Sequence, residues 1–315
     1  MARVISGQRT RGSSGGIGKC TILLVVPGMI WGASFLFIAE GLTAMAPNGV
    51  TFTRIAIGFA ALSLVPMARR PIRPADRGRT AWLGILWLAF PLSMFPFAEQ
   101  HVSSALTGML NGATPMFAAA VASILARRLP PPTVLIGLAV GFLGAILIAL
   151  PSVRGGGESS DQAFGVTLIV AALISYGFAV NLAGPLQQRN GALPVIWRAQ
   201  LVALLLTAPL GIPDVLAAHW SARPVAALVA LGAGGTAAAY VLTAIAAGRM
   251  GATTASSTTF LMPVVALLLG VTVRHEHVVP WSIVGAAICL AGAAAIRQAR
   301  VAQERAVRTA AAEVL

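Results

Sequence analysis

Apolar segments of about twenty residues recur along the whole chain of 315 residues. An α-helix needs about 20 apolar residues to cross the hydrocarbon core of a bilayer. Only 10% of the residues are charged, whereas a soluble domain carries about 25%. This composition argues against a soluble enzyme, a disordered chain and a secreted disulfide scaffold. It predicts an all-α integral membrane protein with ten transmembrane helices, at about residues 20–40, 48–67, 81–98, 102–124, 133–151, 163–186, 192–210, 224–247, 252–273 and 280–297.

The basic residues lie mainly in the short segments that connect these apolar runs. If the N-terminus is cytoplasmic, 17 of the 22 basic residues fall on the cytoplasmic side and three on the other. Such a bias is typical of membrane topology. The net charge of +13 is therefore assigned to topology and not to a nucleic-acid partner. We expect a multi-pass protein of the inner (cytoplasmic) membrane with both termini in the cytoplasm.

An internal repeat relates the two halves of the chain. Near the end of each half the offset is 148 residues, and it pairs Pro115 with Pro263, Pro132 with Pro280, Gly137 with Gly285, and Gly144 with Gly292. Near the start of each half the offset is close to 145 and places Trp31 over Tyr176. Two successive copies of five spans must insert with opposite orientation, which predicts two inverted five-helix repeats. In transporters of this architecture the substrate site lies near the midplane, between the repeats.

The repeat sets the expected domain boundaries. We predict a disordered basic tail at 1–19, a first repeat at 20–151, an extracytoplasmic linker at 152–162, a second repeat at 163–297 and a cytoplasmic tail at 298–315. A cleaved signal peptide is the alternative for the first segment. The apolar run after Lys19 is longer than the core of a typical signal peptide, which favours a retained first helix.

An ordered set of short motifs runs through both halves. It includes the segments 31–35, 47–54, 235–240 and 251–263, and the glycines Gly137, Gly141, Gly144, Gly285 and Gly292. Over about residues 20–298 the set resembles the EamA-like branch of the drug/metabolite transporter superfamily. The resemblance implies secondary transport of amino acids, related metabolites or drugs, and we expect an exporter. The chain departs from the family pattern at Arg128, which stands where the repeat would place an acid equivalent to Glu276.

Two arginines, Arg54 and Arg198, lie inside predicted spans, and a charge inside a membrane is a functional candidate by default. Each could contact a ligand or gate, or could instead reach the interface or bond carbonyls at a helix end. Glu40 and Glu99 lie at a depth similar to Arg54 and are its expected partners. Proton coupling would use Glu40, Glu99, His101 or Glu276, unless these are solvated residues at loop ends.

Polar and aromatic residues well inside the spans are the candidates for a substrate cavity. They are Trp31, Asn111, Tyr176, Asn181, Tyr240, Ser256 and Thr259, with Ser257 and Thr258 beside the last two. Such side chains also bond neighbouring helices, so each has a structural alternative. The repeat-related Pro115 and Pro263 are candidate hinges.

The sequence leaves three functions open. A secondary transporter that works by alternating access is favoured over a lipid-acting membrane enzyme, which would need a cluster of acids, bases or metal ligands at one interface. It is also favoured over a non-transporting membrane sensor or assembly partner, which would keep the repeat but lose the polarity of the cavity. We expect no enzyme activity, no cofactor and no metal, since His275, Glu276 and His277 lie in a short loop without further ligands nearby. The expected partners are a small-molecule substrate, the lipid bilayer and, as a candidate coupling ion, the proton.

Overall fold

The structure of the chain is a computed structural model that describes residues 14–154, 159–250 and 256–313, and every regular element within these ranges is helical. The first half contains α1 (Ser14–Gly41), α2 (Pro47–Ser63), α3 (Arg77–Gly84), α4 (Phe90–Ala98), α5 (Ser104–Asn111), α6 (Thr114–Ala126) and α7 (Pro132–Arg154). The second half contains α8 (Ser159–Asn190), α9 (Ala192–Leu216), α10 (Ala222–Val229), α11 (Ala239–Met250), α13 (Leu261–Val273) and α14 (Pro280–Glu313). Short 3-10 and π-helical segments connect several of them, namely η1 (Pro66–Arg69), η2 (Pro74–Asp76), η3 (Ile85–Ala89), η5 (Ala230–Ala238) and η6 (Ser256–Phe260).

Eight helical stretches of the described chain are long and apolar enough to cross a membrane. They are Ile22–Gly41, Pro74–Ala98, Ser104–Ala126, Pro132–Leu150, Ser160–Asn190, Ala192–Leu216, Ala222–Ala247 and Pro280–Ala299. The two other predicted spans correspond to shorter helices, the 17-residue α2 and the stretch Thr258–Val273. The protein is therefore a multi-pass all-α membrane protein, and the count of ten spans stays a prediction.

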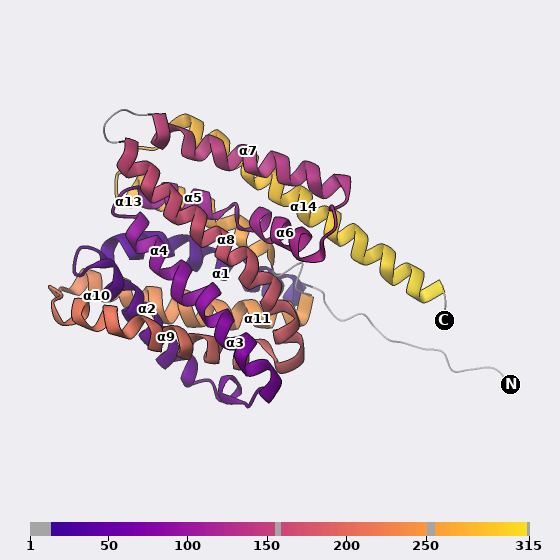
Figure 1. Cartoon of the computed structure of the whole chain (residues 1–315), viewed down its shortest axis with the longest axis horizontal. Helices are drawn as coiled ribbons and strands as arrows, with labels where there is room; N and C mark the ends of the chain where they lie inside the picture. The colour runs from indigo at the N-terminus through magenta and orange to yellow at the C-terminus, as the bar shows by residue number, and fades with distance from the viewer. Residues whose placement is uncertain (1–13, 155–158, 251–255, 314–315) are drawn as a thin grey trace.

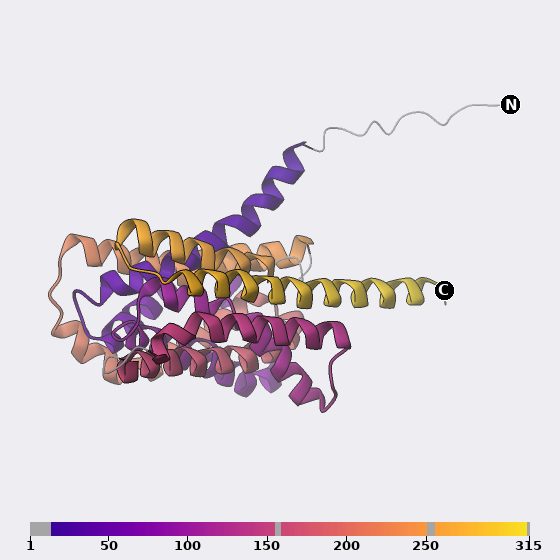
Figure 2. The ribbon, with the colours of Figure 1, turned by 90° about the horizontal axis from the view of Figure 1, so that it is seen from above.

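The helix ends differ in places from the boundaries expected from the sequence. Helix α1 begins at Ser14, inside the predicted tail 1–19, and residues 1–13 lie outside the described chain. Helices α7 and α8 extend into the predicted linker 152–162, of which 155–158 lie outside the described chain. Helix α14 continues to Glu313 and projects beyond the rest of the bundle (Figure 2).

Two of the spans contain π-helical segments at corresponding places. The segment η3 lies between α3 and α4, and η5 lies between α10 and α11, with first residues 145 positions apart. In η3 the Phe90 N–H bonds the Ile85 carbonyl five residues back, and the next residue, Pro91, has no N–H to restore the α-helical ladder. In η5 the Ala239 N–H bonds the Gly234 carbonyl, in a segment that holds three glycines. Segments of this kind are frequent at functional sites.

A second pair of breaks in the helical spans lies at the candidate hinges Pro115 and Pro263. Pro115 is the second residue of α6 and Pro263 is the third residue of α13, where a missing N–H is tolerated. The two interruptions lie against each other, because a Cβ placed on Gly112 would stand 2.5 Å from the Pro263 Cγ. Helices α5 and α13 thus pack closely where each of their spans is broken.

Helices α7 and α14 pack side by side along a line of glycines (Figure 1). A Cβ on Gly144 would stand 2.6 Å from the Gly285 carbonyl oxygen, and one on Gly292 would stand 2.7 Å from that of Gly137. The later glycine of α7 therefore meets the earlier glycine of α14, so the two helices run antiparallel. The four glycines of these two contacts are the same four that the 148-residue offset pairs, Gly137 with Gly285 and Gly144 with Gly292.

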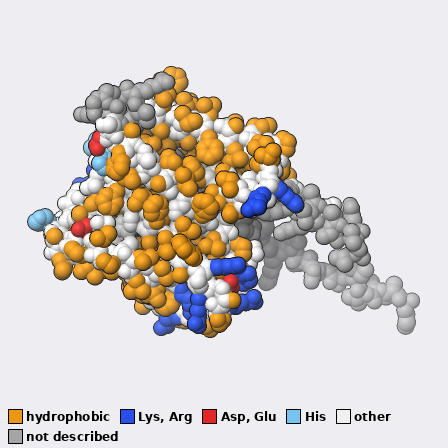
Figure 3. All heavy atoms as spheres, viewed as in Figure 1, with side chains coloured by type: hydrophobic (Ala, Val, Ile, Leu, Met, Phe, Trp, Pro, Cys, Tyr) orange, Lys and Arg blue, Asp and Glu red, His pale blue; other side chains and the backbone are white. Residues whose placement is uncertain are grey.

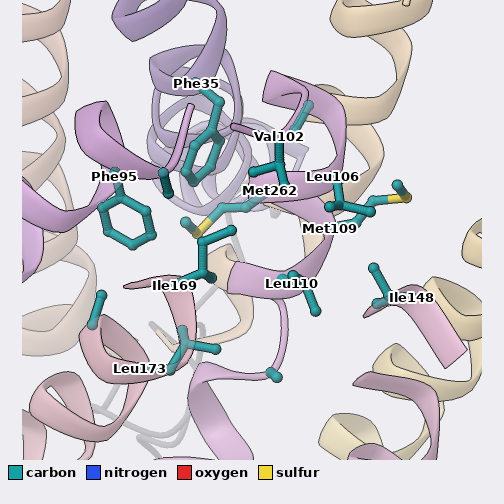
Figure 4. Close-up of a cluster of buried hydrophobic side chains, with 14 of the residues drawn as sticks. Phe35, Phe95, Val102, Leu106, Met109, Leu110, Ile148, Ile169, Leu173 and Met262 are labelled. Carbon is teal, nitrogen blue, oxygen red and sulfur yellow. The ribbon is translucent and has the colours of Figure 1, made fainter. Parts of the chain in front are cut away.

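Apolar side chains cover the flank of the bundle, and basic side chains gather at the end where α3 begins and α6 ends (Figure 3). Exposed residues on the flank include Ile136 and Leu143 of α7 and Leu205 and Leu210 of α9. An apolar surface of this extent fits lipid and not water. Inside the bundle, Phe35, Phe95, Ile169 and Met262 converge from four helices (Figure 4).

The glycine line between α7 and α14 gives a test of this packing. In Gly292→Ala the new methyl group would press against the backbone of Gly137 and Gly141, and we expect the free energy of unfolding to fall by about 1–3 kcal/mol. The matched control is Gly78→Ala, at an exposed position of α3 with nothing within 4 Å, and it should leave stability unchanged or slightly higher. Thermal unfolding of the detergent-purified protein measures both variants, and equal melting temperatures would contradict the packing.

Candidate functional site

A cavity of about 160 Å³ lies inside the bundle, between the two halves of the chain. The first half contributes residues from α1, α2, η3, α4, α5 and α6, and the second half contributes residues from α8, η5, α11, η6 and α13. Five of the predicted cavity residues line it, namely Trp31, Asn111, Tyr176, Tyr240 and Thr259. The structure therefore brings together side chains that are more than 200 positions apart in the sequence.

Aromatic rings form much of the cavity wall. The ring of Tyr240 meets Trp31 edge-on at 5.5 Å between centroids and meets Trp87 edge-on at 5.4 Å. The Trp31 indole N–H donates a hydrogen bond of 2.9 Å to the Gly235 carbonyl in η5. The π-helical segment thus fixes the orientation of the Trp31 ring, and the three rings support one another.

Arg54 supplies the charge of the cavity. Arg54 is only 4% exposed, and its Nε donates a hydrogen bond of 3.4 Å to the Thr236 hydroxyl in η5. Gly235 leaves room for the guanidinium, because a Cβ there would lie 3.9 Å from the Arg54 Nη2. Within the described chain Arg54 forms no ion pair, so the expected partnership with Glu40 and Glu99 is not observed.

Glu40 instead belongs to an ionic cluster at one end of the bundle. We call Glu40, Arg223, Arg274 and Glu276 the Glu40 cluster. The Glu40 carboxylate accepts from Arg223 at 2.7 and 2.8 Å and from Arg274 at 3.0 Å. Arg274 also contacts Glu276 at 3.4 Å, and Glu276 caps the start of α5 by accepting from the N–H groups of Ser104 and Ala105 and from the Ser104 hydroxyl.

A second cluster joins the halves at the opposite end, where η2 meets the end of α8 (Figure 1). We call Arg73, Asp76, Arg189 and Asn190 the Asp76 cluster. Arg189 contacts the buried Asp76 carboxylate at 3.0 Å, and the Asn190 amide donates to it at 2.8 Å. The Asn190 side-chain Oδ1 accepts a hydrogen bond of 2.9 Å from the Arg73 backbone N–H. None of these four residues is among the site candidates that the sequence offers.

The internal repeat contained a signal that could have revealed the Asp76 cluster. Counting 145 residues on from Glu40 leads to Pro185, one helical turn before Arg189, and counting on from Asp76 leads to Ser221, close to Arg223. The two clusters thus occupy corresponding places with their charges exchanged. At one end the acid ends α1 and the arginine starts α10, and at the other the arginine ends α8 and the acid precedes α3.

Glu99 lies away from the first cavity and lines a second one of about 440 Å³, together with His101 and His277. Both of its carboxylate oxygens are buried, and neither has a hydrogen-bond partner in the described chain. Glu99 lies one residue beyond the span Pro74–Ala98, and burial, aided by nearby Glu276, raises its pKa well above the ordinary value. The raised pKa favours the protonated form of Glu99. His101, in the same cavity, contacts the Asp161 carboxylate at 2.6 Å.

Two predicted site residues, Asn181 and Arg198, lie away from the cavity wall. Asn181 donates to the carbonyls of Ala118 and Gly177, at 2.9 and 2.8 Å, and so joins α8 to α6. Arg198 donates to the Pro194 carbonyl at 3.1 Å, and its guanidinium lies 5.4 Å from the centre of the Trp197 ring. A bond to a carbonyl near a helix end is the structural alternative given for this arginine in the sequence analysis. Ser256 begins η6, and its side chain lies outside the described part of the chain.

Comparison with known families decides the class of the protein. The model of the EamA-like transporter family matches residues 18–150 and, a second time, residues 163–298. The chain belongs to the EamA-like transporter family. The resemblance noted in the sequence is thus confirmed, and the family indicates a transporter of small molecules and not an enzyme.

Relatives of this EamA-like protein carry transporter names. It is 25% identical over 300 residues to a probable terminal-alkyne amino-acid exporter of Streptantibioticus cattleyicolor, covering 93% of this chain and 98% of the relative. It is 25% identical over 246 residues to an uncharacterized transporter of Bacillus subtilis, covering 76% and 78% of the two chains. A crystal structure with 18% identity matches 88% of this chain and 96% of its own with a TM-score of 0.62, which shows a shared fold.

The two acids Glu40 and Glu99 make a matched test of the ionic contacts in this EamA-like protein. In Glu40→Gln two arginines lose a charged acceptor, and we expect the free energy of unfolding to fall by about 1–3 kcal/mol. In Glu99→Gln no hydrogen bond or ion pair of the described chain is lost, so stability should change little. The melting temperatures of both purified variants check this, and an equal decrease in the two would contradict the role of the Glu40 cluster.

Proposed function

We propose that this EamA-like protein is a secondary active transporter that exports small metabolites across the inner membrane by alternating access. The observation that carries the proposal is the cavity between the two halves, which has a buried arginine and aromatic walls. Concave, mostly apolar sites with a few polar groups are typical of small-molecule binding. Substrate bound there would contact both halves, so a movement of one half against the other would change its access.

We further propose that the chain has ten spans, built as two inverted repeats at 20–151 and 163–297. The double match of the family model supports two units. The antiparallel pairing of α7 with α14 through repeat-related glycines supports their opposite orientation. The π-helical segments at corresponding places add to this support.

The basic end of the bundle supports an orientation. Arg73, Arg127 and Arg128 are exposed on the connections that lead into α3 and α7, and Arg77 and Arg79 are exposed in the first turn of α3. Basic residues concentrate on cytoplasmic loops, so we place this end, with both termini, in the cytoplasm. The Asp76 cluster then closes the cytoplasmic side, and the Glu40 cluster closes the opposite side.

In this mechanism the two clusters act as gates. Each joins an element of the first half to an element of the second, and opening one side of the cavity would separate its partners. Loss of one cluster would therefore shift the population toward the state that is open at that end. Glu99, in the second cavity near the Glu40 cluster, is the strongest candidate for proton coupling because its carboxylate is buried without a partner.

The transport proposal is tested with purified protein in liposomes. We expect flux of candidate metabolites that responds to an imposed proton gradient, and Arg54→Gln should reduce the flux by about tenfold or more because the cavity loses its charge. Arg79→Gln removes a charge from an exposed position outside the cavity and should transport like the parent protein. Flux that is unaffected by Arg54→Gln would contradict a substrate site in this cavity, and lipid turnover without flux would favour an enzyme.

The gate proposal is tested by access to the cavity. Ser34 lines the cavity, so Ser34→Cys, in a protein whose two native cysteines are replaced by serine, reports access of a membrane-impermeant thiol reagent. Asp76→Asn should raise the labelling rate several-fold from the cytoplasmic side, and Glu40→Gln should raise it from the opposite side. Arg79→Gln is the control, and changes on the same side for both gate variants would contradict the assignment.

A further inference from the structure

The charge of Arg54 has no counterpart in the cavity that it lines. Its guanidinium is buried, it forms no ion pair in the described chain, and no lining residue of the cavity is Asp or Glu. The acids that the sequence offered as candidates lie elsewhere, since Glu40 and Glu276 belong to one ionic cluster and Glu99 lines the second cavity without an ion pair to Arg54. Asp76 belongs to the other ionic cluster. An unpaired charge inside a membrane protein is costly, so an anion would gain free energy by binding beside Arg54.

The hydrogen-bonding groups of Arg54 define which anion fits. The Arg54 Nε donates to the Thr236 hydroxyl, whereas the two terminal nitrogens, Nη1 and Nη2, make no hydrogen bond within the described chain. A guanidinium presents these donors as a planar fork that matches the two oxygens of a carboxylate. One arginine balances one charge. A phosphate monoester, with about −1.5 to −2 charges at neutral pH, would keep an uncompensated negative charge in the cavity.

The size and walls of the cavity define the rest of the ligand. Its volume of about 160 Å³ is close to the roughly 150 Å³ of a cavity that holds benzene. Trp31, Trp87, Phe95 and Tyr240 face it, and aromatic walls favour an apolar body. Because no lining residue in the described ranges carries a carboxylate, this part of the cavity offers no ion-pair partner for an ammonium group.

We propose that the cavity selects a small monocarboxylate with a compact apolar body, that Arg54 binds the carboxylate, and that an amino group on the ligand is not required. This inference rests on the proposed function, because it names the substrate class of the same cavity. It distinguishes an apolar organic acid from a zwitterionic amino acid as the preferred ligand.

Binding of matched small molecules to the full-length purified protein tests the inference by calorimetry. The probes are phenylacetate, its neutral amide phenylacetamide, its α-amino derivative phenylglycine, and the cation benzylamine. We expect phenylacetate to bind at least about tenfold tighter than phenylacetamide, because the amide lacks the charge. Phenylglycine should bind no tighter than phenylacetate, and benzylamine should show no binding.

Variants of Arg54 make the same test from the side of the protein. Arg54→Gln should weaken phenylacetate binding at least about tenfold and leave phenylacetamide binding unchanged. Arg54→Lys keeps the charge without the planar fork and should give an intermediate affinity, whereas Arg79→Gln should bind like the parent protein. The ligand comparison on the unmodified protein decides the question even where Arg54→Gln does not fold.

The outcomes separate this inference from the transport proposal. Equal affinity for phenylacetate and phenylacetamide, or a much higher affinity for phenylglycine, would overturn the monocarboxylate assignment. Flux of other solutes in liposomes without phenylacetate binding would keep the transporter and reject the ligand class. Phenylacetate binding that depends on Arg54, without flux of any solute, would keep the anion site and reject transport.

Discussion

Backbone hydrogen bonding limits how a chain in lipid can depart from the α-helix, and the architecture of this protein follows from that limit. Each N–H and C=O at membrane depth needs a partner, so irregular backbone is tolerated only inside the protein or along a cavity. The interruptions described above obey this rule. Trp87 comes from η3, Thr236 from η5 and Thr259 from η6, while Asn111 and Thr114 flank the break between α5 and α6. All five residues line the same cavity.

The charges divide into two groups with different surroundings. Acids and arginines at the ends of the bundle are paired in the Glu40 and Asp76 clusters, each of which joins the two halves. Arg54 lies deeper, in the cavity wall, and is unpaired in the described chain. Paired charges at the ends favour closure of the bundle, whereas the unpaired charge inside gives the cavity an affinity for a ligand. The proposed cycle uses both.

Much of the architecture could be predicted from the sequence because it depends on local patterns. The apolar segments predict the helices, and the offsets of Pro115 and Gly144 predict a repeat that the double match of the family model supports. Depth along a helix is also readable from sequence, which is why Trp31, Asn111, Tyr176, Tyr240 and Thr259 were placed at the level where the cavity occurs. That they bind substrate stays a prediction.

The direction in which a side chain points around its helix could not be predicted in the same way. Asn181 has the right depth but faces α6. Glu40 lies at the end of α1, but the contact it makes depends on how α10 and the loop after α13 pack beside it. Asp76 lies in a short polar connection that has no apolar pattern to place it. Tertiary packing decides all three cases.

The π-helical segments also set the width of the helical turn at the cavity wall. A hydrogen bond to the carbonyl five residues back closes a wider turn than the bond of an α-helix, which spans four residues. The segment η3 contributes Trp87 to the wall, and η5 contributes Gly235 and Thr236. Since η3 and η5 begin 145 positions apart, the wide turn enters the wall at corresponding places of the two halves, and loss of one residue from either segment would narrow the wall at that place.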